Sequence, residues 1–152
     1  MAPPSNMAQL EKDFFSGRNP LAYIPLCQAL RKRREYTRAL EICQRGLAHD
    51  PESIAGRTLY AHLLSDLGHY EEALREVARA EAVAPETSGL IAEKVNCLIR
   101  LNRYEEAREN LERLNNINPV SPEAQLLTSL YNERHRERRA IIQGQAARES
   151  VP

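Results

Sequence analysis

Apolar residues recur at steps of three and four along most of this chain, which is the spacing of a helix with one buried face. In residues 54–67 these positions are Ile54, Tyr60, Ala61, Leu64 and Leu67. In residues 70–80 they are Ala73, Leu74, Val77 and Ala80. The pattern predicts two amphipathic helices joined by a short turn.

The same pattern returns at an offset of 34 residues. Three residue types stand in register at that offset: Tyr36, Tyr70 and Tyr104; Ala39, Ala73 and Ala107; Pro51, Pro85 and Pro119. An alanine allows two helices to cross closely, and a proline separates one helix from the next. We therefore predict three repeats, at residues 20–53, 54–87 and 88–121.

The turns and the helix starts repeat as well. Gly68 occupies a turn site where a left-handed residue is needed, and Asn102 is the next most suitable residue for it. The first repeat has Arg34 there. Asn19 and Ser121 each precede a proline, as a helix N-cap followed by a first-turn proline does.

A 34-residue unit with a Leu-Gly-x-Tyr turn, a small residue early in the second helix and a proline near its end resembles the tetratricopeptide repeat. Leu67-Gly68-His69-Tyr70, Ala73 and Pro85 match that pattern best, and the resemblance covers residues 20–121. It implies an all-α fold, an α-solenoid of three helix-turn-helix repeats, with a protein-binding role.

The N-terminal segment, residues 1–19, is predicted to hold a short amphipathic helix after a possible Ser5 cap. Its apolar stripe consists of Met7, Leu10, Phe14 and Phe15. Two interpretations stay open: the helix caps the exposed side of the first repeat, or it lies in the binding groove until a partner displaces it.

The C-terminal part is predicted to be a solvating helix at residues 122–143 and a flexible tail at 144–152. Ala124, Leu127 and Tyr131 can pack back on the third repeat, and the other side of the helix is polar, as solubility requires of the last helix of a repeat array. The charged run at 133–139 has acid and base on all sides and predicts a solvated extension.

Stacked helix pairs curve, and the first helix of each pair lines the inner surface. First-helix residues that packing does not need form the predicted partner-binding groove: Leu21, Ile24, Gln28, Arg31, Lys32, Ala55, Thr58, His62, Ser65, Asp66, Gly89, Ala92, Asn96, Ile99 and Arg100. The groove is apolar at one end and basic at one edge. It favours an amphipathic helix or a partly acidic peptide of another protein.

Some tetratricopeptide-repeat proteins hold the C-terminal carboxylate of chaperones with a clamp of lysine and asparagine. The corresponding positions here are Ile24, Gln28, His62, Ala92 and Asn96. They include no lysine, so the resemblance does not extend to that activity.

The charges are balanced, with 21 lysines and arginines against 21 aspartates and glutamates, so no long-range field attracts nucleic acid. The basic run at 31–34 is either solvated at the negative end of its helix or contacts an acidic partner. No aromatic residues are interleaved with it, which disfavours nucleic acid.

No metal-binding, phosphate-binding or catalytic motif is present, so we predict a protein that is not an enzyme and has no cofactor and no metal. Cys27, Cys43 and Cys97 lie in apolar helical stretches and are interpreted as reduced thiols; Cys27 and Cys43 fall on facing helices. Without a signal peptide pattern or a membrane span, we expect a cytoplasmic location.

The leading hypothesis is an adaptor or scaffold that binds a partner protein in its groove. One alternative is a small tetratricopeptide-repeat chaperone of a secretion system, which holds a client segment before export. The other is a non-catalytic assembly or regulatory subunit of an enzyme complex.

Overall fold

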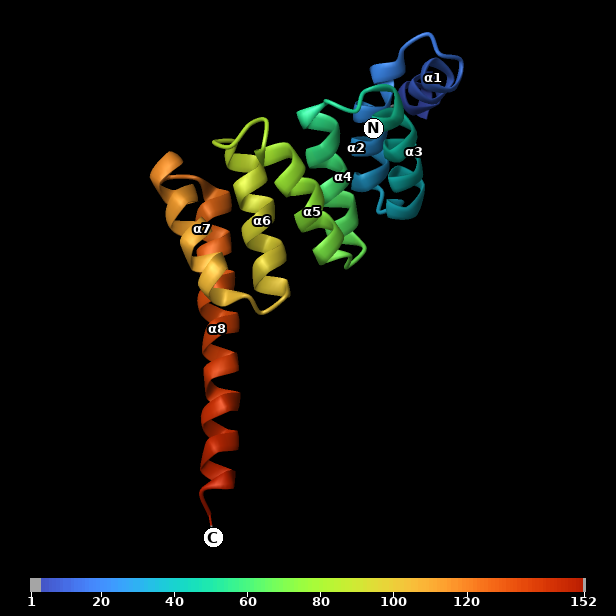
Figure 1. The fold of residues 1–152 in the computed structure, drawn as a ribbon. Coiled ribbons are helices and arrows are strands. Elements are labelled where there is room, and N and C mark those ends of the chain that lie inside the picture. The colour runs from blue at the N-terminus through green and yellow to red at the C-terminus, as the bar shows by residue number, and fades with distance from the viewer. Residues whose placement is uncertain (1–3, 152) are drawn as a thin grey trace. The chain divides into compact units, whose positions relative to one another are not determined.

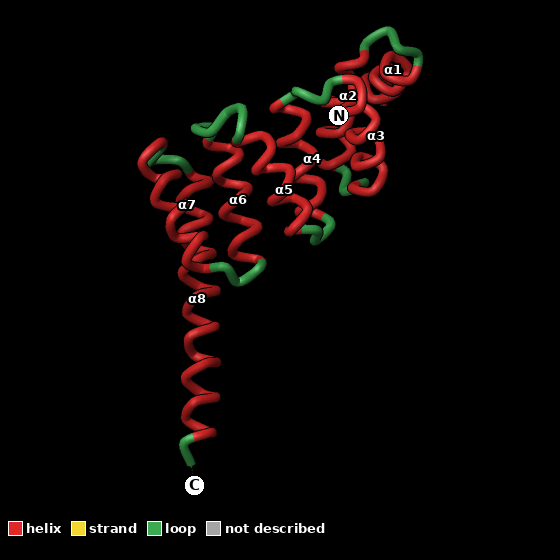
Figure 2. The backbone as a smooth tube through the Cα atoms, viewed as in Figure 1, coloured by secondary structure: helices red, strands yellow, loops and turns green. Residues whose placement is uncertain are grey.

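The structure is a computed structural model that describes residues 4–151, with side chains from residue 6 onward. Its regular elements there are helices (Figures 1 and 2): α1 Pro4–Phe15, the short 3-10 helix η1 Pro20–Ala22, α2 Tyr23–Lys32, α3 Tyr36–His49, α4 Ile54–Asp66, α5 Tyr70–Glu81, α6 Ser88–Arg100, α7 Tyr104–Ile117 and α8 Pro122–Glu149. The chain divides after Pro85 into an N-terminal unit and a C-terminal unit.

The helix bounds repeat at the predicted offset. The first helices of the three pairs, α2, α4 and α6, end at Lys32, Asp66 and Arg100. The second helices, α3, α5 and α7, begin at Tyr36, Tyr70 and Tyr104. The all-α repeat fold expected from the sequence is confirmed.

Each first helix ends in the same hydrogen-bonded turn. In the second pair, the Gly68 N–H donates to the Ser65 carbonyl at 3.0 Å, and the His69 N–H donates to the Leu64 carbonyl at 2.8 Å. This is a Schellman motif, which satisfies carbonyls at the helix end and reverses the chain. The equivalent bonds are Arg34 to Arg31 (2.9 Å), Glu35 to Leu30 (3.0 Å), Asn102 to Ile99 (3.1 Å) and Arg103 to Leu98 (2.9 Å).

The central residue of each turn is left-handed. Its φ angle is 62° at Arg34, 82° at Gly68 and 60° at Asn102. Only glycine adopts this region without opposition from Cβ, so the first turn keeps an unfavourable backbone for a long side chain. The three repeats therefore share the turn geometry although the residue type differs.

Side-chain caps begin η1, α4 and α8. The Asn19 Oδ1 accepts from the Leu21 N–H at 3.2 Å, as the sequence predicts. The Ser121 Oγ accepts from the Ala124 N–H at 3.3 Å, also as predicted. Ser53 caps α4 in the same way, from the Gly56 N–H at 3.0 Å.

The core of the N-terminal unit is built around Tyr23, which is fully buried. A Cβ placed on Gly46 would lie 2.1 Å from the Tyr23 Cγ, and one placed on Gly56 would lie 2.2 Å from its hydroxyl oxygen. Two helical glycines therefore make room for one aromatic side chain. Burial raises the pKa of Tyr23.

Small residues line the helix crossings. Ala39, Ala73 and Ala107 are fully buried. Cys27 and Cys43 are buried too, and a hydrogen bond with Cys27, followed by burial, raises the pKa of the Cys43 thiol. The two thiols lie on facing helices and donate to backbone carbonyls, Cys27 to that of Ala39 at 3.3 Å and Cys43 to that of Gly56 at 3.6 Å, so both serve as packing groups.

Helix α1 packs as a cap on the N-terminal unit. Phe14 joins the core, with its ring centroid 6.2 Å from that of Tyr23, and Met7 and Leu10 pack against the same cluster. Glu11 pairs with Arg38 of α3. Phe15, in contrast, stays exposed. The predicted Ser5 cap lies outside the described side chains.

Helix α8 packs through Ala124, Leu127 and Tyr131, which are buried as predicted. It then continues past its expected end at residue 143 to Glu149 and extends away from α6 and α7 (Figure 1). Apart from Gly144, residues 140–149 include good helix formers and no proline, so local propensity does not stop the helix at that glycine.

Replacing Arg34 with glycine should stabilise the protein. The left-handed backbone costs a non-glycine residue about 1–2 kcal/mol, and the greater unfolded-state entropy of glycine offsets part of that gain. We expect the thermal midpoint to rise by about 1–3 °C in differential scanning calorimetry. Lys32→Gly, within the last turn of the right-handed α2, should lower the midpoint, and a lower midpoint for Arg34→Gly would contradict the turn assignment.

Gly46→Ala should destabilise the protein although alanine favours helices. The new Cβ overlaps the Tyr23 ring, and overpacking of this kind costs about 1–3 kcal/mol. Gly89→Ala is the matched control, because Gly89 is also helical and nothing lies within 4 Å of an added Cβ. Urea unfolding of both variants is the measurement, and equal stability would show that the Tyr23 site can relax.

Candidate functional site

One row of side chains on the first helix pair remains accessible. Leu21 is 55% exposed, Ile24 is half-buried, and Gln28 and Lys32 are exposed. Their spacing of three, four and four residues places them on one side of η1 and α2. We call these four residues the α2 stripe; it changes from apolar to amide to cationic along the helix.

Arg31 and Asp66 pair with each other between α2 and α4. The Arg31 Nη2 lies 3.2 Å from the Asp66 Oδ1, and its Nε contacts the Oδ2. This two-point geometry fixes the orientation of both side chains. Two residues predicted for the groove thus neutralise one another, and Lys32 carries the cation of the stripe.

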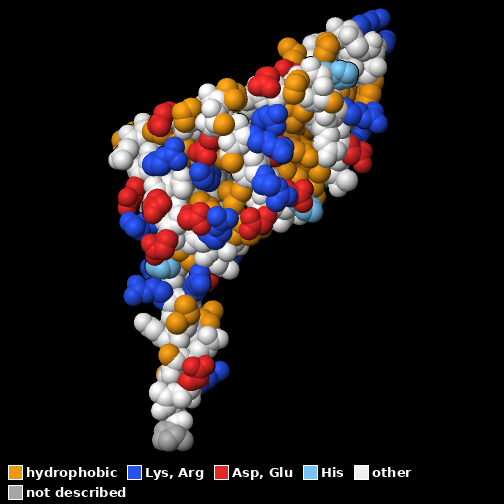
Figure 3. Space-filling view, viewed as in Figure 1, with side chains coloured by type: hydrophobic (Ala, Val, Ile, Leu, Met, Phe, Trp, Pro, Cys, Tyr) orange, Lys and Arg blue, Asp and Glu red, His pale blue; other side chains and the backbone are white. Residues whose placement is uncertain are grey.

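One other arginine of the basic run at 31–34 also forms an ion pair within the chain. Arg33 pairs with Glu35 at 3.1 Å, and Arg34 is exposed. Acidic and basic side chains are interspersed over the face drawn in Figure 3. The sequence left open whether this run was solvated or contacted a partner, and the structure supplies partners within the chain for Arg31 and Arg33.

Helix α4 has fewer accessible groove side chains than the sequence predicts. The Thr58 hydroxyl donates to the Ile54 carbonyl at 2.7 Å, His62 is half-buried and Ser65 is buried. Ala55 is exposed but has only a methyl group to offer. The accessible chemistry of the N-terminal unit therefore lies mainly on α2.

An ion network that the sequence reasoning missed ties α4 to α5. Glu76 is 9% exposed and accepts from Arg57 at 3.1 Å and from Arg79 at 2.7 Å. Arg57 also donates to the Pro51 carbonyl at 2.6 Å. Nothing in the helical period distinguishes Glu76 from a solvated glutamate, so only the three-dimensional packing could reveal it.

The C-terminal unit has fewer accessible groove residues than the sequence predicts. Ala92 and Ile99 are 1% and 2% exposed, so they are not available to a partner. Ala92, Val95 and Ile99 follow one another at steps of three and four residues, so they lie on one face of α6. All three are buried, so this face belongs to the core. Gly89 and Asn96 are half-buried, whereas Arg100 is exposed.

Extending the 34-residue register into α8 finds a residue missed earlier. Leu126 follows Ala92 by one repeat and is 69% exposed. Leu130, equivalent to Asn96, is half-buried. Since α8 begins where a fourth repeat would begin, the same register could have identified both from the sequence.

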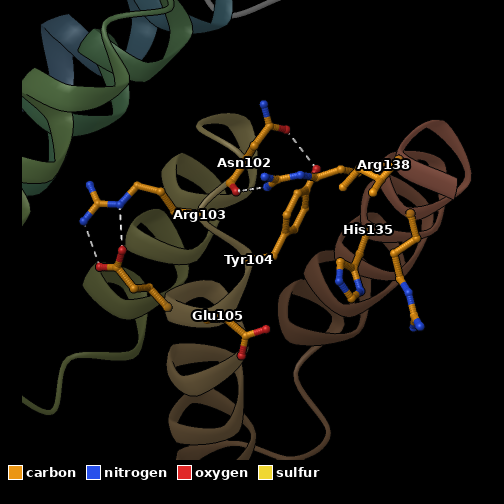
Figure 4. A pocket seen from close by; sticks show the side chains of 9 residues that line it. Asn102, Arg103, Tyr104, Glu105, His135 and Arg138 are labelled. Carbon is orange, nitrogen blue, oxygen red and sulfur yellow. Dashed lines mark hydrogen bonds and ion pairs between the residues drawn. The ribbon is translucent and has the colours of Figure 1, made fainter. Parts of the chain in front are cut away.

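A hollow of about 400 Å³ in the C-terminal unit lies beside the turn between α6 and α7 (Figure 4). The Tyr104 hydroxyl donates to the Asn102 Oδ1 at 2.9 Å. Arg138 donates to the Asn102 carbonyl at 2.6 Å and lies over the Tyr104 ring, while His135 stacks on Tyr131. These groups hold α8 against α7.

The charged part of α8 is mostly exposed, in keeping with the predicted solvated extension. His135 and Arg138 also contact aromatic rings of α7 and α8. At the rim of the hollow, Arg103 binds Glu106 through two bonds of 2.7 and 2.8 Å and holds the pKa of that carboxyl below its usual range. The hollow is consequently a structural junction.

The helices and the clusters of possible metal ligands were compared with what a membrane span and a metal site require. In residues 4–151, no helix has the length and apolar character that crossing a membrane requires. Across the same part of the chain, no three histidine, cysteine, aspartate or glutamate side chains gather in a way that could hold a metal ion.

Sequence comparison gives a partial match. Residues 11–80 match the profile of a family described as anaphase-promoting complex, cyclosome, subunit 3. No curated protein matches the chain.

Solved structures match over most of the chain. A tetratricopeptide repeat protein from Parabacteroides merdae has a TM-score of 0.73 at 18% identity, over 86% of this chain and 53% of its own. This chain therefore spans about half the length of that protein. A thermophilic tetratricopeptide-repeat protein of Thermus thermophilus has a TM-score of 0.73 at 22% identity, over 96% of this chain and 81% of its own.

A third similar structure contains a ligand. The second tetratricopeptide domain of human RPAP3, in complex with the HSP70 peptide SGPTIEEVD, has a TM-score of 0.66 at 21% identity, over 75% of this chain and 98% of its own. At such identities the likeness concerns the fold. Together with the 34-residue register of its helices, these matches show that the chain has a tetratricopeptide-repeat fold.

Proposed function

We propose that this protein is a non-catalytic adaptor that binds a peptide or helix of a partner protein on the first-helix side of its repeats. The observation that carries the proposal is the α2 stripe, which packing within the N-terminal unit leaves accessible. An apolar side chain as exposed as Leu21, beside a half-buried isoleucine, is a surface that a partner can cover.

The order of side chains along the stripe favours one kind of ligand. From Ile24 to Lys32 the helix rises about 12 Å, at about 1.5 Å per residue. A partner segment would place an apolar side chain on Leu21 and Ile24 and an acidic group near Lys32. The Gln28 amide between them can donate to or accept from the backbone of an extended peptide.

The fold supports a binding role, since other tetratricopeptide domains are solved with peptides of partner proteins. The chaperone-tail clamp is not part of the proposal, because its positions here lack lysine. Recognition in this protein would instead combine apolar contact with a single cation.

The stripe can be tested with the double variant Leu21→Asp, Gln28→Glu. Both residues are exposed, so the fold should survive, and circular dichroism checks it. Affinity purification with quantitative mass spectrometry should recover a specific partner with the parent protein and at least about ten-fold less with the variant, a loss of about 1.4 kcal/mol.

The matched control is Arg75→Glu, Glu109→Lys, which changes exposed residues of the second helices α5 and α7 and should recover the partner at the parent level. Equal recovery by the stripe variant and the parent would sink the assignment. The partner's nature separates the remaining alternatives: a stoichiometric enzyme favours an assembly subunit, and an exported client favours a secretion chaperone.

A further inference from the structure

A second hollow lies on the N-terminal unit, lined by residues of α1, η1, α3 and the loop after α1, and by none of the α2 stripe. It measures about 320 Å³, which is within the size range of small-ligand sites. Its lining is mostly apolar and includes no acidic residue: Phe14, Phe15, Gly17, Pro20, Arg45, Ala48 and His49.

An exposed aromatic ring and a cation meet in this hollow. Phe15 is 56% exposed, whereas its neighbour Phe14 is buried in the core. The Arg45 guanidinium carbon lies 5.8 Å from the centroid of the Phe15 ring. This contact is within cation–π range and holds the guanidinium at the apolar surface.

The repeats show why Arg45 is available there. Arg79 and Arg113 occupy the same position in the second and third repeats. Arg79 donates to Glu76 at 2.7 Å, and Arg113 donates to Asn110 at 3.0 Å, in each case three residues earlier on the same helix. The first repeat has the buried Ile42 at that place, which offers no acceptor.

Arg45 consequently makes no ion pair within residues 4–151, and its guanidinium rests on the Phe15 ring. A guanidinium without a carboxylate, beside an apolar surface, can bind one from another molecule through two parallel hydrogen bonds. The His49 side chain at the same rim adds a further polar group.

Backbone bonds fix the wall of the hollow before any ligand binds. The Gly17 N–H donates to the Phe14 carbonyl at 3.1 Å, and the Asn19 N–H donates to the Asp13 carbonyl at 3.1 Å. Gly17 takes a φ of 73°, which suits glycine, and Pro20 restricts the next turn. Binding there requires little ordering of the loop, which lowers its entropic cost.

We propose that this hollow is a second binding site, for an acidic peptide segment of a partner protein in which a bulky apolar side chain stands next to a carboxylate. The apolar side chain lies against Phe15, Ala48 and Pro20. The carboxylate pairs with Arg45. The site does not depend on the α2 stripe, since none of its lining residues belongs to that stripe.

The test uses blocked tetrapeptides as probes in NMR titrations of the full chain. The acidic probe is Asp-Leu-Phe-Glu, and the matched basic probe is Lys-Leu-Phe-Lys, each acetylated and amidated at its ends. The acidic probe should cause saturable shifts in residues 14–20 and 45–49 and bind at least about ten-fold more tightly than the basic one, a difference of about 1.4 kcal/mol.

Variants assign the effect to Arg45. Arg45→Glu should weaken binding of the acidic probe at least about ten-fold, and Arg45→Lys should give an intermediate loss, because lysine keeps the charge without the planar pair of donors. Arg75→Glu, a charge reversal at an arginine of α5, should leave the affinity unchanged. Circular dichroism confirms that each variant is folded.

Three results would overturn the proposal: no saturable shift at millimolar probe, equal affinity for both probes, or full affinity retained by Arg45→Glu. Shifts confined to residues 21–32 would also overturn it while leaving the function proposed for the α2 stripe in place.

Discussion

The hydrogen bonds that close each turn between paired helices set the geometry on which everything else depends. They require a left-handed residue at positions 34, 68 and 102, and each turn then returns the chain antiparallel to its first helix. The alanines at the crossings can approach closely only because this turn fixes the register. The direction in which α2 presents its accessible stripe follows from the same turn.

The first repeat differs most from the other two in the residues at equivalent positions. These differences determine which of its side chains are accessible. Tyr23 fills a site that glycines at 46 and 56 leave open, and it anchors α1 through Phe14. Where the later repeats have Glu76 and Asn110 to bind an arginine, the first has Ile42. The Arg45 guanidinium therefore packs on the Phe15 ring. Both proposed binding surfaces consequently include residues of the first repeat.

Most of the fold was predictable because three residue series share one period, and a period constrains backbone geometry directly. The 34-residue spacing of the helices, the Asn19 and Ser121 caps and the buried face of α8 followed from it, whereas the end of α8 did not. The site was less predictable, because accessibility depends on side chains far apart in sequence. Arg31 was expected in the groove and is bound to Asp66; Ala92 and Ile99 were expected there and are buried. Leu126 could have been found by carrying the register one repeat further.

Hydrogen–deuterium exchange on the complex with the purified partner tests the central claim most directly, because it reports where the partner binds without any substitution. Binding at the α2 stripe should protect the backbone amides of residues 21–32 beyond their protection in the free protein, with little change in α5. Protection confined to α5, or to the end of α8 beyond residue 140, with residues 21–32 unaffected, would contradict it.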